Sequence, residues 1–371
     1  MTWLTPWRLR AWPTALLVGV AAVFLLQVAV AEGSVTLGGR LGGDLPAFVG
    51  AARLLRAGGD LYDPAAQAAV QADLVPGGTF CWYAWPPIVA ALYLPLTFLP
   101  WKLAVLLHTV GTTTAAALGI RWWARRYGLP VAIAVPAALS FYPLLRSLPG
   151  GQLTGLLILL AAGPAWLGGA LLVKPQLGLF PLVAAGRWRA FLLGGAGVYL
   201  GSAVVAGWAW PRTWVPAAMQ FTHAAAADPG SVSLWDHPLP FAGVAVIAAC
   251  AWRVRGDPDR RVALALAAAP LLAPHALWYD VGLAVLPLGL VAARGGRRGL
   301  PWLVGVWLIG LGMIVAPGPI GVGVLVMTCV LVAAVRAGGA SGTSSSPPPP
   351  AGARTHFAEN DRGASAPTPG V

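Results

Sequence analysis

Long apolar runs recur along the chain as far as residue 335, and they limit its fold more than any other feature. A helix needs about 20 mostly apolar residues to cross a lipid bilayer, and several of these runs have that length. Hydrophobic residues make up 58% of the 371 residues and charged residues only 10%, whereas about 25% of a soluble domain is charged. The sequence therefore predicts an all-α polytopic membrane protein, and it excludes a soluble enzyme.

The formal net charge of +12 does not indicate nucleic-acid binding, because the basic residues lie in short clusters between the apolar runs. Membrane proteins mark their cytoplasmic loops in this way. The three cysteines, Cys81, Cys250 and Cys329, are far apart in the sequence, so neither a disulfide framework nor a metal site is predicted. We expect a protein in the lipid bilayer with no nucleic-acid partner and no cofactor.

Spans can be placed by length and apolar composition at about residues 12–31, 102–120, 129–146, 190–208, 238–252, 262–278, 279–293, 300–316 and 318–335. The first is longer than the apolar core of a signal peptide, so we expect an uncleaved helix. One more region, 152–185, is apolar but is interrupted by three prolines and Lys174. Such interruptions indicate broken or re-entrant helices, which membranes tolerate only where protein or water covers the irregular backbone.

Placing alternate loops in the cytoplasm brings most of the 24 basic residues to that side, as the positive-inside rule expects. Both termini are then cytoplasmic. Region 152–185 must cross the membrane an odd number of times, because Arg187 has to return to the cytoplasm. One crossing gives ten spans in total, and three short crossings give twelve.

Two substantial loops, at about 32–101 and 209–237, then face the exterior together with most of the acidic residues. We therefore expect any chemistry on the exterior face. Within the first loop, the stretches LPAFVGAARLLRAG and PAAQAAVQADLV have helical apolar spacing and predict short interfacial helices. The membrane domain is expected over residues 1–336. Residues 337–371 are rich in Gly, Ser and Pro, which predicts a disordered cytoplasmic tail.

Five segments follow one another in an order that a known family shares. They are GGDLPAFVGAARLLRAGGDLYDP, WYAWPPIVAALYLPLTFLP, GGQLTGLLILL, LLVKPQLGLFPLVAAGRWRA and APHALWYDVGLAVLPL. Together they resemble glycosyltransferase family 87, and the resemblance extends over about residues 10–335. The chain departs from the family at Trp-Tyr-Ala-Trp-Pro-Pro, where the family more often has Tyr directly before the prolines.

The resemblance implies a GT-C bundle of about 10–12 transmembrane helices that transfers a hexose, typically mannose, from a polyprenyl-phosphate sugar donor. It also implies an active site facing the exterior or periplasm of a bacterial plasma membrane, with a glycolipid or lipoglycan as acceptor. A transporter or flippase for a lipid-linked sugar is the alternative, because broken helices and intramembrane charges also mark transport sites. The long first exterior loop favours the transferase.

The resemblance implies that Asp44, at the start of the first exterior loop, is in the family's catalytic position. A general base needs a carboxylate close to the acceptor hydroxyl, and a single base attacking opposite the leaving phosphate implies inversion at the anomeric carbon. The alternative is that Asp44 only caps the helix that begins near Pro46. Asp60 and Asp63 flank Tyr62 in the sequence GGDLYDP and are predicted to be turn or cap residues.

Four residues are candidates for binding the donor phosphate or sugar: Lys174, Arg146, Gln152 and His275. A lysine within an apolar run is costly unless it finds a partner or reaches the interface, and a phosphate is a suitable partner. Arg146 could instead anchor a span, and Gln152 could instead cap the next helix. For His275 the alternative is a structural histidine at the interface.

The aromatic residues Trp82, Tyr83 and Trp85 are candidates for stacking on an acceptor sugar. Trp and Tyr also gather at every membrane interface, which is the alternative explanation. The second exterior loop contains His223, Asp236 and His237, whose spacing is not that of metal ligands. We therefore predict no metal.

Overall fold

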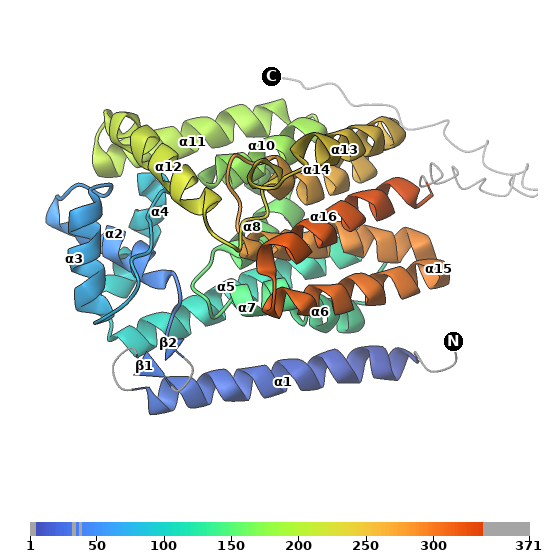
Figure 1. The fold of residues 1–371 in the computed structure, drawn as a ribbon, viewed down its shortest axis with the longest axis horizontal. Helices are drawn as coiled ribbons and strands as arrows, with labels where there is room; N and C mark the ends of the chain where they lie inside the picture. Colours follow the sequence, from blue (N-terminus) through green and yellow to red (C-terminus); the bar gives the residue numbers. More distant parts are fainter. Residues whose placement is uncertain (1–4, 32–34, 37–38, 337–371) are drawn as a thin grey trace, which may run out of the picture. The chain divides into compact units, whose positions relative to one another are not determined.

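The structure, a computed structural model, describes residues 5–31, 35–36 and 39–336. Helices make up most of these residues (Figure 1), and the prediction of an all-α polytopic membrane protein is confirmed. Two short strands in the described part, β1 (Val35–Thr36) and β2 (Gly39–Arg40), pair in antiparallel orientation. The tail predicted at 337–371 lies outside the described residues.

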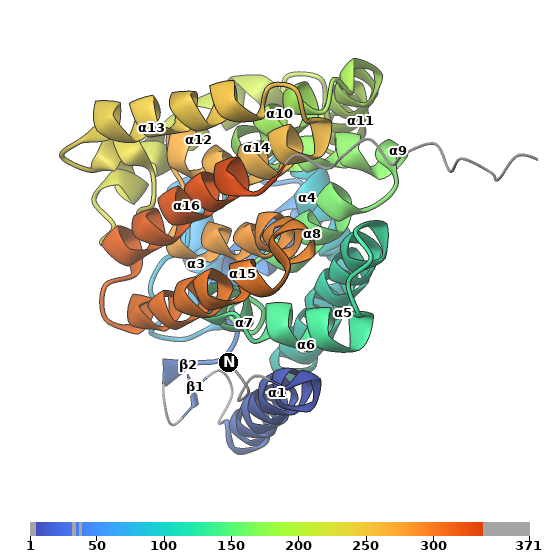
Figure 2. The same ribbon diagram turned by 90° about the vertical axis from the view of Figure 1, so that its right-hand side faces the viewer.

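Four of the described helices are long and apolar enough to cross a membrane: α1 (Pro6–Val30), α5 (Trp101–Arg126), α11 (Trp188–Ala206) and α16 (Pro317–Ala334). All four agree with predicted spans. Helix α1 follows Thr5, whose side chain accepts a hydrogen bond from the N–H of Arg8, and it begins with Pro6 at a position that favours proline. None of its residues is buried, and Figure 2 shows α1 at the edge of the bundle beside α6.

Further helices and 3-10 turns complete the membrane bundle. They are α6 (Val131–Leu139), α7 (Tyr142–Ser147), α8 (Thr154–Ala162), α9 (Ala165–Gly168), α10 (Pro175–Ala184), α13 (Pro240–Val254), α14 (Pro258–Leu272) and α15 (Val285–Leu311), with the 3-10 turns η2 (Gly169–Val173), η4 (Trp278–Ala284) and η5 (Gly312–Ile314). Helix α15 consists of two helices that meet at Gly296, where φ is 53°. This break separates the spans predicted at 279–293 and 300–316.

Proline changes two of the predicted spans. The span predicted at 129–146 is divided into α6 and α7, because Phe141 is extended and Pro143 has no N–H to continue the helix. The span predicted at 262–278 ends at Leu272, because Ala273 precedes Pro274 and takes the extended conformation that this position favours. Both predictions were therefore too long as continuous helices.

Region 152–185 is broken, as predicted, into α8, α9, η2 and α10. The nine residues of α8 rise by only about 14 Å, whereas the hydrocarbon core is about 30 Å thick. Gln152 before α8 and Lys174 before α10 line the same cavity, so the chain leaves this level of the bundle with α8 and returns to it with η2. The number of membrane crossings stays a prediction.

The described part of the loop that is predicted to be exterior, 32–101, folds into a separate group of helices, called here the outer group: α2 (Leu45–Ala57), α3 (Pro64–Leu74), α4 (Pro87–Leu92) and the turn η1 (Leu94–Phe98). Helices α2 and α3 match the two predicted short helices. Helix α2 is mostly buried, since Leu45 and Phe48 pack in a second hydrophobic core with Tyr83 and Tyr93. The rings of Phe48 and Tyr93 stack with centroids 5.0 Å apart. Helix α2 is thus the centre of the outer group rather than a helix lying alone on lipid.

The second loop that is predicted to be exterior, 209–237, contains a helix that the sequence does not lead us to expect. This is α12 (Trp210–Ala226), and it is followed by the turn η3 (Leu234–Asp236). The indole N–H of Trp214 in α12 donates to the carbonyl of Ala84 at 3.0 Å, which links α12 to the outer group. The predicted loop at 209–237 is therefore largely ordered structure.

The positive-inside rule places several helix ends on the same side of the membrane, and in the structure some of these helix ends are in contact. Arg126 at the end of α5 and Arg294 in α15 both bind the carboxylate of Asp259 in α14, with N–O distances of 2.7 and 3.0 Å. Arg260 donates to the carbonyl of Ala333 at the end of α16. In Figure 1, the outer group and the two strands lie at the opposite end of the bundle from the start of helix α1. The sorting of loops into two faces is supported, while the side that each face occupies stays a prediction.

Labelling of single cysteines tests the orientation. With the three native cysteines replaced by alanine, Ala57→Cys at the exposed end of α2 is expected to react with a membrane-impermeant maleimide in intact cells. Gly256→Cys, in the loop between α13 and α14, is the matched control, because a Cβ there meets no atom within 4 Å. It is expected to react only after permeabilisation. The reverse pattern would contradict the predicted topology.

Candidate active site

A cavity of about 280 Å³ lies where the outer group meets the membrane bundle. It brings together residues that are far apart in the sequence, including six of the predicted site residues. The lining consists of Asp44, Ala47, Phe48, Thr79, Phe80, Cys81, Trp82, Ala84, Trp85, Gln152, Val173, Lys174, Pro175, Gln176, Phe221, Asp228, His275, Leu277 and Tyr279. Carboxylate, ammonium, amide and imidazole groups therefore line one cavity.

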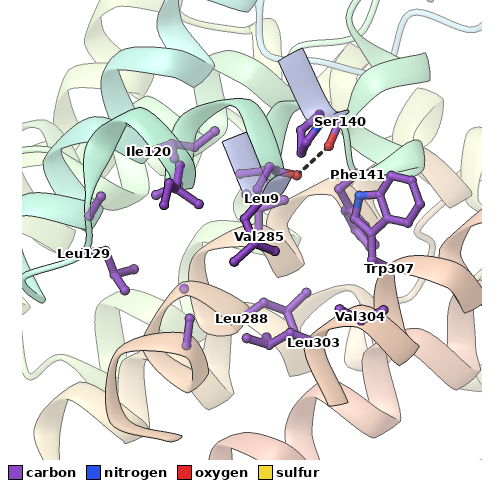
Figure 3. Close-up of a pocket in the computed structure, with 18 of the residues that line it drawn as sticks. Leu9, Ile120, Leu129, Ser140, Phe141, Val285, Leu288, Leu303, Val304 and Trp307 are labelled. Atoms are coloured by element: carbon purple, nitrogen blue, oxygen red, sulfur yellow. Dashed lines mark hydrogen bonds between the residues drawn. The ribbon is translucent and has the colours of Figure 1, made fainter. Parts of the chain in front are cut away.

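A larger cavity of about 630 Å³ lies between α1, α5, α6 and α15. Figure 3 shows apolar side chains around it, among them Leu9, Leu288 and Trp307. The hydroxyl of Ser140 in its wall already donates to the carbonyl of Ala137 at 2.9 Å. Because a reaction site needs several convergent polar groups, the smaller cavity is the candidate active site.

Two Gly-Gly turns join the outer group to the bundle beneath the cavity. One turn precedes Asp44 and the other precedes Gln152. The N–H of Asp44 donates to the carbonyl of Gly150 at 3.0 Å. Gly43 and Gly151 have φ values of 50° and 78°, and a Cβ on either would lie 2.3 Å from a backbone atom of the opposite turn. Glycine is therefore required at both positions, and the close approach brings the Asp44 and Gln152 side chains together.

The carboxylate of Asp44 points into the cavity and not along α2. Asp44 precedes α2, but its side chain makes no capping hydrogen bond, so the capping alternative is wrong. It accepts a hydrogen bond from Nε2 of Gln152, and the thiol Sγ of Cys81 lies 3.6 Å from its Oδ1. Burial raises the pKa of Asp44 above its usual range, and the hydrogen bonds from Cys81 and Gln152 partly oppose this rise. The group is therefore a stronger proton acceptor than an exposed aspartate.

The segment from Cys81 to Trp85 forms one wall of the cavity, and α3 holds its backbone. Nε2 of Gln71 donates to the carbonyl of Cys81 at 2.7 Å, and Oε1 of Gln71 accepts the N–H of Cys81 at 2.9 Å. Gln67, one turn earlier on α3, accepts the N–H of Tyr83 at 3.1 Å. Both glutamine side chains are buried and satisfy backbone groups that a neighbouring strand would otherwise have to satisfy.

Lys174 is paired inside the protein. Its Nζ lies 2.6 Å from Oδ1 of Asp280 in η4, and the two residues are only 6% and 1% exposed. The rings of Trp85 and Tyr279 have centroids 5.2 and 5.1 Å from Nζ, within range of a cation–π interaction. Oδ2 of Asp280 also accepts the N–H of Leu277 at 3.2 Å. The alternative of a lysine that reaches out to the interface is therefore wrong.

His275 lies in the loop between α14 and η4, and both of its ring nitrogens have partners. Nδ1 is 2.7 Å from Oγ1 of Thr222 in α12, and Nε2 is 2.9 Å from Nε2 of Gln176 in α10. Since the glutamine nitrogen can only donate, the network assigns the ring proton to Nδ1. Burial, followed by the charge of Lys174, lowers the pKa of His275 to about 4. The imidazole is thus neutral near pH 7 and links α12 to α10 beside the cavity.

Two predicted site residues do not reach the cavity. Arg146 is exposed on α7, with its guanidinium carbon 5.4 Å from the ring centroid of Trp278. Its position agrees with the anchor alternative. Tyr83 is 1% exposed and packed in the core of the outer group, so its predicted stacking on an acceptor sugar is wrong. Its neighbours Trp82 and Trp85 do line the cavity.

The other acidic residues singled out in the first loop have local roles. Oδ1 of Asp60 accepts the N–H of Tyr62 at 2.9 Å, and Oδ1 of Asp63 accepts the N–H of Ala65 at 3.0 Å at the start of α3. The turn and cap predictions are therefore confirmed. Within the part of the chain that the structure describes, no group of three or more His, Cys, Asp or Glu residues could hold a metal ion.

Several residues at the site are not predicted from the sequence. They are Cys81, Gln176, Phe221, Asp228 and Tyr279 in the lining and Asp280 behind Lys174. Asp280 could have been predicted as a candidate partner of Lys174, because a lysine within an apolar run needs a counter-ion and Asp280 lies at a predicted helix junction. Cys81 could not have been predicted in this way, since a single cysteine in an aromatic stretch is compatible with many roles.

Comparison with known proteins identifies the family. The family model of glycosyltransferase family 87 matches residues 83–276, which is more than half of the chain. The chain belongs to glycosyltransferase family 87. No curated protein and no solved structure matches the chain significantly. The family 87 match makes this protein a membrane glycosyltransferase, and the matched residues include Gln152, Lys174 and His275 but not Asp44.

Removing the counter-ion of Lys174 is expected to destabilise this family 87 protein strongly. Asp280→Asn keeps the size of the side chain but leaves a buried ammonium unpaired, which costs about 3–5 kcal/mol in the free energy of unfolding. Asp73→Asn is the matched control, because Asp73 pairs with Arg53 at 2.6 Å while its side chain is 74% exposed. That change is expected to cost at most about 1 kcal/mol. Thermal unfolding in detergent measures both, and equal losses would contradict the assignment.

Proposed function

We propose that this glycosyltransferase moves a hexose, which we take to be mannose, from a polyprenyl-phosphate donor to a glycolipid or glycan acceptor. The proposed location is the outer face of a bacterial plasma membrane, with both termini in the cytoplasm. One observation carries the proposal: the carboxylate of Asp44 and the buried ammonium of Lys174 line the same cavity. A base and a cation are the two groups that such a transfer needs.

Asp44 acts as the general base. It takes the proton of the acceptor hydroxyl while the hydroxyl oxygen forms a bond to the anomeric carbon of the donor. The bond from that carbon to the phosphate oxygen breaks, and the polyprenyl phosphate leaves with the electron pair. Because burial raises the pKa of Asp44, its carboxylate draws the proton more strongly than an exposed aspartate would.

Lys174 stabilises the departing phosphate. Its ammonium has three N–H donors, and Asp280 accepts one of them, so two are available to a ligand in the cavity. Negative charge grows on the phosphate as the bond to the sugar breaks, and a fixed cation therefore lowers the energy of the transition state more than that of the bound donor. The amide of Gln176, which His275 orients, supplies a further polar group for the phosphate or the sugar hydroxyls.

The walls of the cavity suit a sugar ring with a lipid tail. Trp82 and Trp85 present aromatic surface on which a sugar face can stack, while the polyprenyl chain stays in the bilayer. A single base that delivers the nucleophile opposite the leaving phosphate gives inversion at the anomeric carbon, as in inverting hydrolases.

Replacement of Asp44 by Asn tests the base. The amide keeps the size of the side chain but cannot accept a proton, so transfer is expected to fall about a hundredfold or more while the protein still folds and binds donor. Wild-type kcat/KM is expected to fall on the acid side at a higher pH than an aspartate of usual pKa would give, because only the deprotonated form serves and its pKa is raised.

Asp60→Asn and Asp63→Asn are the controls for this measurement, since both side chains bind only local backbone. They are expected to transfer radiolabelled sugar at wild-type rates. Full activity in Asp44→Asn with loss in either control would move the base to the turn at Tyr62. A flippase, which the broken helices also suit, would yield no labelled product with any variant.

The cation is tested at Lys174. Lys174→Ala is expected to weaken donor binding more than Lys174→Arg does, because arginine keeps the positive charge near the phosphate while changing its geometry. A charge-assisted contact of this kind is worth about 1.5–3 kcal/mol, or at least tenfold in affinity. Equilibrium binding of a fluorescent polyprenyl-phosphate sugar measures it. Normal affinity in both variants would limit Lys174 to its structural pair with Asp280.

A further inference from the structure

Both carboxylate oxygens of Asp44 are occupied by side-chain donors from other parts of the chain. Nε2 of Gln152 donates to Oδ2. The thiol of Cys81 lies 3.6 Å from Oδ1 and 3.7 Å from the carbonyl of Thr79, and we assign its single hydrogen to the charged acceptor, Asp44. Gln152 comes from the Gly-Gly turn before α8, whereas Cys81 comes from the segment that α3 holds through Gln71. We call the two donors, Gln152 and Cys81, the Asp44 clamp.

We infer that Gln152 and Cys81 are positioning residues that aim the carboxylate of Asp44 at the acceptor hydroxyl. The inference rests on the proposed function of Asp44 as the general base. Each carboxylate oxygen has two lone-pair sites, so the clamp occupies one site on each oxygen and leaves the other open to the cavity. A carboxylate that is held in this way presents its free lone pairs in one direction, and such preorganisation is a large part of catalytic rate.

The clamp is itself rigidly supported. Gln152 is 4% exposed, and its backbone is fixed by the contact between the two Gly-Gly turns. Cys81 has its N–H and its carbonyl bonded to the same side-chain amide, that of Gln71. Neither donor depends on a long, exposed side chain, so the geometry at Asp44 is determined by packed backbone on both sides.

The clamp also opposes the effect of burial on the charge of Asp44. The groups that face Asp44 are Cys81 from the wall segment, Gln152 from the turn before α8, Asp228 after α12 and Lys174 before α10. Burial and the charge of Asp228 favour the protonated acid, whereas the two clamp hydrogen bonds and the charge of Lys174 favour the carboxylate. Loss of either donor therefore raises the pKa of Asp44 further and lowers the fraction of ready base.

Kinetics of clamp variants test the inference. Cys81→Ser keeps a hydrogen-bond donor and Cys81→Ala does not. We expect Cys81→Ala to lower kcat severalfold and Gln152→Ala to lower it about tenfold or more, since hydrogen bonds to charged groups are the stronger ones. In Cys81→Ala and in Gln152→Ala, we expect the acid limb of the pH profile of kcat/KM to move to higher pH. In Cys81→Ser, we expect the acid limb to stay at its wild-type pH. If Gln152→Ala instead raises KM and leaves the acid limb at its wild-type pH, Gln152 binds the donor, and the inference is overturned for this residue.

The contact between Cys81 and Asp44 is measurable without sugar transfer. Burial, followed by the negative charge of Asp44, raises the pKa of Cys81 to about 12, which suppresses the reactive thiolate. In a protein with Cys250→Ala and Cys329→Ala, the added change Asp44→Asn is expected to speed alkylation of Cys81 by iodoacetamide about tenfold, because the charge is gone. Asp60→Asn, which alters an exterior carboxylate away from the cavity, is the matched control and is expected to leave the rate unchanged.

The two measurements separate the clamp from the proposed function. In one outcome, Asp44→Asn loses transfer but does not change the alkylation rate of Cys81, and Cys81→Ala does not move the acid limb. This outcome overturns the clamp and leaves Asp44 as the general base. Full transfer in Asp44→Asn overturns the general base and with it any catalytic role of the clamp. Loss of transfer together with faster alkylation and a shifted acid limb supports both.

Discussion

The contact between two backbone turns, one in the outer group and one in the membrane bundle, is the feature on which the candidate site depends. The N–H of Asp44 donates to the carbonyl of Gly150, and only glycine fits at Gly43 and Gly151. A buried backbone group that loses its partner costs about 1–3 kcal/mol, so the two turns are held together by more than packing. Helix α2 begins at this contact and α8 begins close to it, which places both walls of the cavity relative to each other.

The buried pair of Lys174 and Asp280 explains why the adjoining membrane segment is broken. An ammonium at this depth needs a counter-ion and a cover of protein, because lipid supplies neither. The chain meets both needs by returning through η2 to Lys174 and starting α10 at Pro175. A continuous helix over 152–185 would carry Lys174 along a regular spiral, away from the level of Gln152. The interruptions are thus the means by which one region supplies two residues to one cavity.

Single residues at the site were predictable where their chemistry contrasts with their surroundings. Asp44 and Lys174 stand out because each is a charge beside an apolar run. Their partners were not predictable, because the bonds from Gln152 to Asp44 and from Lys174 to Asp280 join residues 108 and 106 positions apart. Helix packing decides such pairings, and neither periodicity nor composition encodes it.

Errors in the predicted fold have a similar origin. Hydropathy identifies 129–146 as one span, because it counts apolar side chains and takes no account of the N–H that Pro143 lacks. Tyr83 looks equivalent to Trp82 and Trp85 in the sequence, yet its ring is in the core of the outer group. Side-chain direction within an irregular segment depends on what the backbone is bonded to, in this case Gln67 on α3.

The way α3 holds the wall segment has a consequence for how substrate preference can diverge. Gln67 and Gln71 bind the N–H and carbonyl groups of Cys81 and Tyr83, which every residue type except proline possesses. The side chains at Phe80 and Trp82, which line the cavity, can therefore be exchanged without loosening the wall. Mutation can thus change the surface that contacts a new sugar or lipid, while the two Gly-Gly turns keep Asp44 and Gln152 in the same positions.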